Sequence, residues 1–175
     1  TEHETLVVAG HEVRLSNPGK LYFPAAKITK LDLANFYVAV GEPLMRTVRD
    51  RPVLLERYPN GVKEKSFYQK RIPDSAPGWL QTTTVQTING TPSRALVIAD
   101  LAHVLWAVNM GVLGLHVWPF RASEPDDADE MGLGEVAGGV GEEDSGPAQH
   151  VVAPVGGGFN AIQGHGTDDE EGHGE

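Results

Sequence analysis

The chain has 175 residues, which is enough for one domain with a hydrophobic core of ordinary size. It has no cysteine, which excludes a disulfide framework or a thiolate zinc site, and no apolar run approaches the roughly 18 residues that a membrane span needs. The N-terminus lacks the basic and apolar regions of a secretory signal, so we expect a cytoplasmic protein without membrane partners.

The formal net charge of −10 is distributed unevenly along the chain. All 14 Lys and Arg lie at or before Arg121, together with 10 acids, so this part carries a formal charge of +4. Residues 122–175 hold the other 14 acids and no Lys or Arg. A basic body can attract phosphate, whereas an acidic tail repels phosphate or competes with it.

The first third of the chain predicts a hairpin followed by helix. Short apolar runs on both sides of Gly10 indicate a hairpin with this glycine in the turn. Thr29 is a good N-cap, and Asp32 stands where a capping-box acid belongs. Apolar residues then recur at helical spacing over 33–48. Pro43 interrupts this stretch and predicts a kink, or a break with Pro43 opening a second short helix.

The middle of the chain alternates strands with one further helix. Asn89-Gly90 is a strong hairpin turn. Asp100 is the expected N-cap of a helix that ends at Gly111. Strands are predicted over residues 53–57, 66–72, 82–88, 94–98 and 113–118.

The last part of the chain has a different composition. From Met131 to Glu175 there are 13 Gly and one aromatic residue, Phe159, with neither a helical nor a two-residue apolar period. Such a segment buries too little apolar surface to offset its loss of conformational entropy. We therefore predict a domain over residues 1–125 and a disordered, glycine-rich acidic tail over 126–175.

Two clusters of basic residues could bind nucleic acid. Lys20 and Lys30 flank a turn and open a helix, where a phosphate would meet free N–H groups and a positive dipole; the alternative is ordinary surface lysines. Basic residues from Arg57 to Arg71 are interleaved with Phe67 and Tyr68, which suits stacking on bases. The alternative is a hairpin with apolar residues inside and lysines outside.

The two aromatic residues and one histidine are further candidates for the site. In a regular strand, Phe67 and Tyr68 point to opposite faces, so one could lie in the core while the other stacks. His116 stands alone in an apolar stretch, which is more typical of a core histidine than of a ligand.

A series of short strings, in order and spacing, resembles the N-terminal part of the polymerase domain of bacterial DNA ligase D. The strings are LSNPGKLYFP at 15–24, ITK at 28–30, DRPV at 50–53, ERYPNGV at 56–62, SFYQK at 66–70, APGW at 76–79, DLA at 100–102 and LHVWP at 115–119. That domain belongs to the archaeo-eukaryotic primase superfamily and serves non-homologous end joining. The resemblance covers about residues 11–125.

The resemblance implies a fold, partners and site residues. The fold is α+β, with a mixed or antiparallel sheet and packed helices. The partners are DNA ends, with ligase D or other end-joining proteins beside them. By residue, Lys20 and Lys30 hold a 5′-phosphate, Phe67 and Tyr68 stack on the template, Arg57 and Lys70 contact the DNA backbone, and His116 lies near the incoming nucleotide.

The chain departs from the family where the catalytic residues are expected. The family continues into an apolar strand with Asp-x-Asp-Pro, whose carboxylates hold the Mn or Mg ions used with nucleoside triphosphates. Here Met131-Gly132-Leu133-Gly134 follows the acidic stretch, and Asp127-Ala128-Asp129 lies in a predicted polar loop. We therefore assign no catalytic residue, metal ligand or cofactor to this chain, and we interpret residues 131–175 as a frameshifted or recombined terminus.

The activity left to such a chain has three interpretations. The first is DNA-end binding without nucleotidyl transfer, because recognition residues are present and the metal ligands are not. The second is a non-catalytic accessory module that docks on a separately encoded catalytic half. The third is a truncated relic without function.

Overall fold

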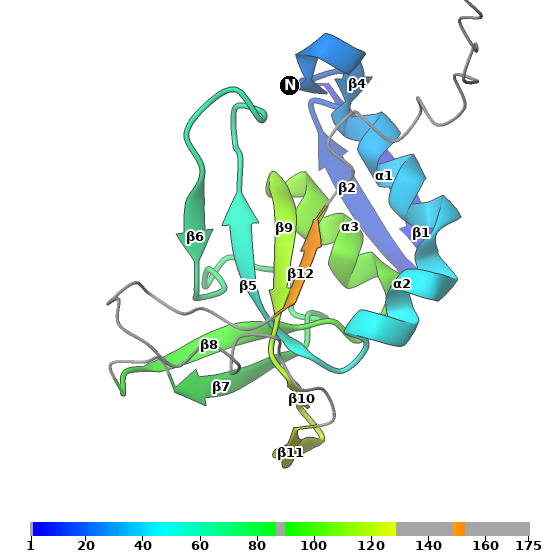
Figure 1. Ribbon diagram of the computed structural model, residues 1–175. Coiled ribbons are helices and arrows are strands. Elements are labelled where there is room, and N and C mark those ends of the chain that lie inside the picture. The colour runs from blue at the N-terminus through cyan, green and yellow to red at the C-terminus, as the bar shows by residue number, and fades with distance from the viewer. Residues whose placement is uncertain (1, 87–89, 129–148, 153–175) are drawn as a thin grey trace, which may run out of the picture.

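A computed structural model describes residues 2–86, 90–128 and 149–152. Its centre is a six-stranded antiparallel sheet in the order β12-β9-β5-β8-β7, with β6 also pairing with β5. Helix α3 (Leu101–Asn109) lies between this sheet and a second layer formed by the β1–β2 hairpin and α1 (Figure 1). The sheet strands are β5 (Pro52–Arg57), β6 (Phe67–Gln69), β7 (Thr82–Gln86), β8 (Pro92–Val97), β9 (Val112–Val117) and β12 (Gln149–Val152).

The N-terminal hairpin forms as predicted. β1 (His3–Val8) pairs with β2 (His11–Ser16) from His3↔Ser16 to Val8↔His11. Ala9 and Gly10 make the turn, with φ of 49° and 79°. Two positive φ angles in a two-residue loop match the right-handed twist of the strands, and Gly10 adopts its angle without strain. The short strands β3 (Leu21–Phe23) and β4 (Ile28–Thr29) follow, joined by a 3₁₀ turn at Pro24–Ala26.

The predicted capping box starts the first helix, and the helical stretch is broken before Pro43. The Thr29 hydroxyl accepts from the Asp32 N–H at 3.1 Å, and the Asp32 carboxylate accepts from the Thr29 N–H at 2.9 Å. α1 (Lys30–Ala39) ends at Ala39, because Pro43, four residues later, has no N–H to donate to the Ala39 carbonyl. α2 (Gly41–Val48) therefore begins two residues earlier than Pro43.

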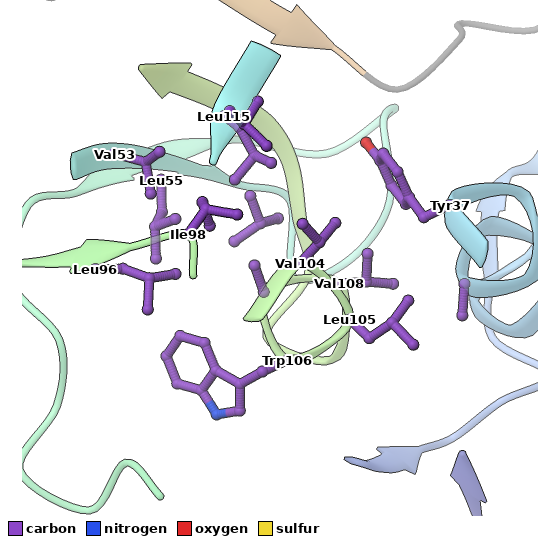
Figure 2. Close-up of a cluster of buried hydrophobic side chains, with 14 of the residues drawn as sticks. Tyr37, Val53, Leu55, Leu96, Ile98, Val104, Leu105, Trp106, Val108 and Leu115 are labelled. Atoms are coloured by element: carbon purple, nitrogen blue, oxygen red, sulfur yellow. The ribbon is translucent and has the colours of Figure 1, made fainter. Parts of the chain in front are cut away.

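Helix α3 is buried on nearly all sides. Asp100 caps it through the Ala102 N–H at 2.8 Å, and Gly111 follows its end with φ of 80°. Residues 102–108 are all buried because the sheet covers one side and α1 and β2 cover the other. Figure 2 shows the cluster: Val53, Leu55, Leu96 and Leu115 from the sheet, with Ile98 just after β8, lie on the Val104 side of α3, whereas Leu105 lies on the side of Tyr37 from α1.

The other predicted strands form with shorter bounds. β6 covers three residues of the predicted 66–72 strand, because the Ile72 N–H bonds to the Arg94 carbonyl at 3.0 Å and Pro73 follows. β7 and β8 make the predicted hairpin, whose turn includes residues 87–89 outside the described ranges. Within those ranges, each helix is too short or too polar to cross a bilayer.

Two short segments of the predicted disordered tail, 126–175, belong to strands in the part of the chain that the structure describes. β10 (Phe120–Arg121) pairs with β11 (Glu124–Ala128), so the acidic stretch predicted as a polar loop is a short bulged hairpin. β12 pairs antiparallel with β9, from Gln149↔Val117 to Val152↔Gly114. An average over 45 residues conceals a short β-branched run, and the edge of β9 offers unpaired backbone groups for it. The remaining tail residues, 129–148 and 153–175, lie outside the described ranges.

Candidate nucleic-acid interface

Phe67 and Tyr68 lie on β6 and His116 lies on β9, and both strands pair with β5. In the register of β5, Glu56 pairs with Tyr68 of β6 and with Gly114 of β9, while Arg57 pairs with Phe67. Side chains alternate along strands, so Tyr68, Glu56 and His116 share one face of the sheet. Phe67 and Arg57 lie on the other face, the one that packs on α3 farther along. The two rings thus lie on opposite faces, as a regular strand requires.

Phe67 is exposed and held in place by Arg57. The guanidinium carbon of Arg57 lies 5.1 Å from the Phe67 ring centroid, a cation–π contact. Its Nε donates to the Met110 carbonyl at 2.8 Å and its Nη1 to Gln69 Oε1 at 2.6 Å. Burial lowers the pKa of this guanidinium, with the neighbouring Tyr22 acting in the opposite sense. Arg57 therefore uses much of its hydrogen-bonding capacity inside the protein and braces the ring.

On the opposite face, His116 lies in a hydrogen-bonded group with Glu56 and Tyr58. His116 Nε2 is 3.1 Å from Glu56 Oε2, and the Tyr58 hydroxyl donates to Glu56 Oε1 at 2.7 Å. That hydrogen bond is the main reason why the pKa of Tyr58 is raised. The Tyr68 ring meets the His116 ring edge-on, with centroids 5.2 Å apart at 80°. His116 is 3% exposed, whereas Tyr68 is 53% exposed.

Lys70 is exposed at the end of β6, and the chain around it is fixed. The Ser93 hydroxyl donates to the Lys70 carbonyl at 3.2 Å. Farther along, Arg71 and Arg94 both approach Asp74 Oδ1, at 3.2 Å and 3.5 Å. The segment is thereby tied to β8, and Lys70 is exposed directly after the strand that carries Phe67 and Tyr68.

Lys20 is half-buried at the turn that follows β5. Its ammonium donates to the Pro59 carbonyl and lies 3.4 Å from Asn60 Oδ1. The turn itself is fixed by Gly61, whose φ is 88° and where a Cβ would lie 3.0 Å from the Leu21 carbonyl oxygen. Arg57 ends β5 three residues before Asn60, so the turn that Lys20 contacts directly follows the strand that carries Arg57.

Lys30 is buried, although its place at the start of α1 suggested an exposed lysine. Its ammonium donates to the Ser16 carbonyl at 2.7 Å and the Asn109 carbonyl at 3.1 Å, with Asn109 Oδ1 at 3.5 Å. Burial, with a smaller contribution from the charge of Lys20, lowers the pKa of Lys30 to about 8. Lys30 therefore joins the ends of β2 and α3 to the start of α1, and its phosphate role stays a prediction.

Sequence reasoning missed three residues that shape this region: Glu56, Asn109 and Gly114. A Cβ at Gly114 would lie 2.6 Å from Glu56 Oε2 and 3.3 Å from His116 Nε2, so the glycine leaves space for that pair. The pairing of β5 with β9 brings Glu56, Gly114 and His116 together, and the chain itself gives no signal for that pairing. Within the described residues, no group of three or more His, Asp or Glu is placed to hold a metal ion.

This fold and this arrangement define a primase-polymerase class of domain. The family described as LigD, primase-polymerase domain matches residues 29–133, and the chain belongs to that family. The predicted α+β fold, with an antiparallel sheet and packed helices, is confirmed by a solved structure, the polymerase domain from Mycobacterium tuberculosis ligase D in complex with DNA. The TM-score is 0.59 at 28% identity, over 81% of this chain and 43% of that one.

Curated relatives agree with this assignment. The chain is 33% identical over 142 residues to the multifunctional non-homologous end joining DNA repair protein LigD of M. tuberculosis H37Rv, covering 80% of this chain and 17% of that protein. It is 32% identical over 114 residues to the LigD of Mycolicibacterium smegmatis, covering 65% and 15%. The chain thus spans less than a fifth of the length of these relatives.

Proposed function

We propose that this chain binds DNA ends in non-homologous end joining. The observation that carries the proposal is the pair of exposed rings on β6, with Phe67 46% and Tyr68 53% exposed. Large aromatic side chains are normally buried, and these are braced from beneath by Arg57 and His116. Stacking on such rings contributes about 1–3 kcal/mol per base. The similarity to a polymerase domain solved with DNA supports the same function.

In this proposal the basic residues contribute to DNA binding in different ways. Lys70, exposed directly after β6, contacts the DNA backbone, while Arg57 contributes charge and orients Phe67. Lys20 contacts the 5′-phosphate through the N–H donor of its ammonium that the Pro59 carbonyl and Asn60 Oδ1 do not occupy. Lys30 supports that phosphate from a buried position, and His116, which contacts the Tyr68 ring, lies near the incoming nucleotide in this proposal.

Binding to a gapped duplex tests the proposal. We expect the chain to bind a gap with a 5′-phosphate more tightly than the same gap without one. Lys20→Gln should reduce that preference by about tenfold and lower the salt dependence by about one phosphate contact. Both constants are measured by fluorescence anisotropy across a salt series.

Arg46→Gln is the matched control, because it removes one positive charge from the exposed surface of α2. It should leave the phosphate preference unchanged. Equal affinity of the native chain for both gaps would contradict the proposed 5′-phosphate site.

We further propose that the chain alone does not extend a primer. The described residues offer no carboxylate cluster for the two metal ions of the family, and the chain spans 43% of the solved polymerase domain. Template-dependent addition should therefore be at background level with Mn²⁺ and all four nucleoside triphosphates. Extension that rises in proportion to the concentration of purified chain would overturn this prediction.

An accessory module that docks on a separately encoded catalytic half stays the second interpretation. Co-expression with such a half distinguishes the two. An accessory module should co-purify with it and restore primer extension, whereas an independent end-binding protein should do neither.

A further inference from the structure

We propose that Glu56 is a positioning residue that fixes the ring orientation and tautomer of His116, and that Gly114 provides the space for this contact. The proposal rests on the proposed function for its ligand, a nucleoside triphosphate. The contact between Glu56 and His116 can be tested without any ligand.

Both oxygens of the Glu56 carboxylate are engaged on the same face of the sheet. Oε2 lies 3.1 Å from His116 Nε2, and Oε1 accepts from the Tyr58 hydroxyl at 2.7 Å. A carboxylate has no proton to donate, so the hydrogen between it and the ring belongs to His116 Nε2. The hydrogen bond from Tyr58 prevents the carboxylate from turning away from the ring.

The space around this contact depends on Gly114. In the β5–β9 register Gly114 lies opposite Glu56, and a Cβ there would lie 2.6 Å from Oε2 and 3.0 Å from the Glu56 Cβ. Side-chain atoms essentially never approach that closely, so any larger residue would displace the carboxylate. The Glu56 side chain can lie across β9 toward His116 because Gly114 has no side chain.

The positioned ring is also the support for Tyr68. His116 is 3% exposed and meets Tyr68 edge-on at 5.2 Å, while Tyr68 is 53% exposed. The Glu56 carboxylate, whose side chain is 14% exposed, therefore acts through His116 on the ring that is proposed to meet bases. Because neither Glu56 nor Tyr58 is proposed to contact DNA or nucleotide, their effect is one of positioning.

The tautomer of His116 is measured by the nitrogen chemical shifts of its ring in the native chain, with His116→Gln as the assignment control. We expect the shifts of an Nε2-protonated ring in the native protein. Glu56→Ala and Gly114→Ala should both change them, since one removes the carboxylate and the other displaces it. Glu56→Gln, which keeps an acceptor of the same shape, should retain most of the native pattern.

ATP with Mg²⁺ is the ligand probe. Glu56→Ala should weaken ATP binding by about tenfold, the effect of one hydrogen bond to a charged group, while Glu56→Gln should recover most of it. Glu64→Ala, an exposed acid in the loop after β5, is the matched control and should change neither readout.

The two proposals fail in different ways. Native ring shifts in both Glu56→Ala and Gly114→Ala would overturn the positioning role. If His116→Gln binds ATP as tightly as the native chain, the nucleotide role of His116 is wrong, and the ring shifts still decide whether Glu56 positions it. Should Glu56→Ala fail to fold, the comparison of Gly114→Ala with Glu56→Gln gives the same decision.

Discussion

Replacing Lys30 with methionine should lower the free energy of unfolding by about 2–4 kcal/mol at pH 7. The Lys30 ammonium bonds to the Ser16 carbonyl at 2.7 Å and the Asn109 carbonyl at 3.1 Å, and the residue is 4% exposed. Methionine fills a similar volume but leaves those acceptors buried without a donor, at about 1–3 kcal/mol each. Relief of the cost of burying the ammonium offsets part of this loss. Urea unfolding measures the difference.

The same substitution should also remove a pH dependence of stability. Burial first, and the charge of Lys20 second, lower the pKa of Lys30 from 10.5 to about 8. The folded state thus releases this proton at lower pH than the unfolded state. The contribution of Lys30 to stability is therefore constant below about pH 8 and rises between about pH 8 and 10.5. We expect a positive slope from pH 8 to 9.5 in the native chain and a flatter profile in Lys30→Met.

Lys27→Met is the control for this experiment, because Lys27 is an exposed lysine in the same segment. It should change stability by less than about 0.5 kcal/mol and leave the pH profile unchanged. A Lys30→Met protein as stable as the native chain, but without a preference for phosphorylated gaps, would contradict the structural role. It would identify Lys30 as a phosphate ligand that becomes accessible when DNA binds.

Features that the sequence predicted correctly depend on interactions between residues close in the chain. Thr29 and Asp32 of the capping box are three residues apart, and the turn at Gly10 depends on the positive φ of that glycine itself. Asp100 caps α3 through a residue two positions on. Each of these signals is complete within one turn of chain, so no knowledge of the tertiary fold is needed.

Features that the sequence could not predict depend on contacts between distant segments. His116 meets Glu56, 60 residues away, and Lys30 meets Asn109, 79 residues away. The spacing of lysines could not show that Lys30 is buried, because burial follows from the packing of α1 against α3. In the candidate site, the opposite orientations of Phe67 and Tyr68 were predictable from strand geometry. Their braces, Arg57 and His116, were not, because they follow from strand register.

Replacing Arg51 with methionine should lower the free energy of unfolding by about 3–5 kcal/mol, more than Lys30→Met does. The side chain is 0% exposed, its Nε donates to the Thr47 carbonyl at 2.9 Å, and its Nη1 donates to the Trp118 carbonyl at 3.1 Å. It therefore joins the end of α2 to the end of β9 just before β5 begins. Methionine would leave several buried polar groups without their partner. Thermal and urea unfolding check the expected loss.

Two matched variants separate charge from geometry. Arg49→Met removes an exposed arginine two residues away and should cost less than about 0.5 kcal/mol. Arg51→Lys keeps the charge but not the planar fork, so it should lie between Arg51→Met and the native chain. A loss in Arg51→Met no greater than in Arg49→Met would show that the buried guanidinium contributes no net stability.

The consequence of losing Arg51 should extend along the strands to the candidate site. The Trp118 N–H donates to the Pro52 carbonyl at 3.0 Å, and pairing then runs from Val53↔Val117 to the register that sets Glu56 opposite Gly114. If Arg51 holds the first of these pairs together, Arg51→Met should speed amide hydrogen exchange along β5 and β9 more than in α1. The geometry predicts local opening at this strand pair. Uniformly faster exchange would contradict it and would mean that the substitution acts only through global unfolding.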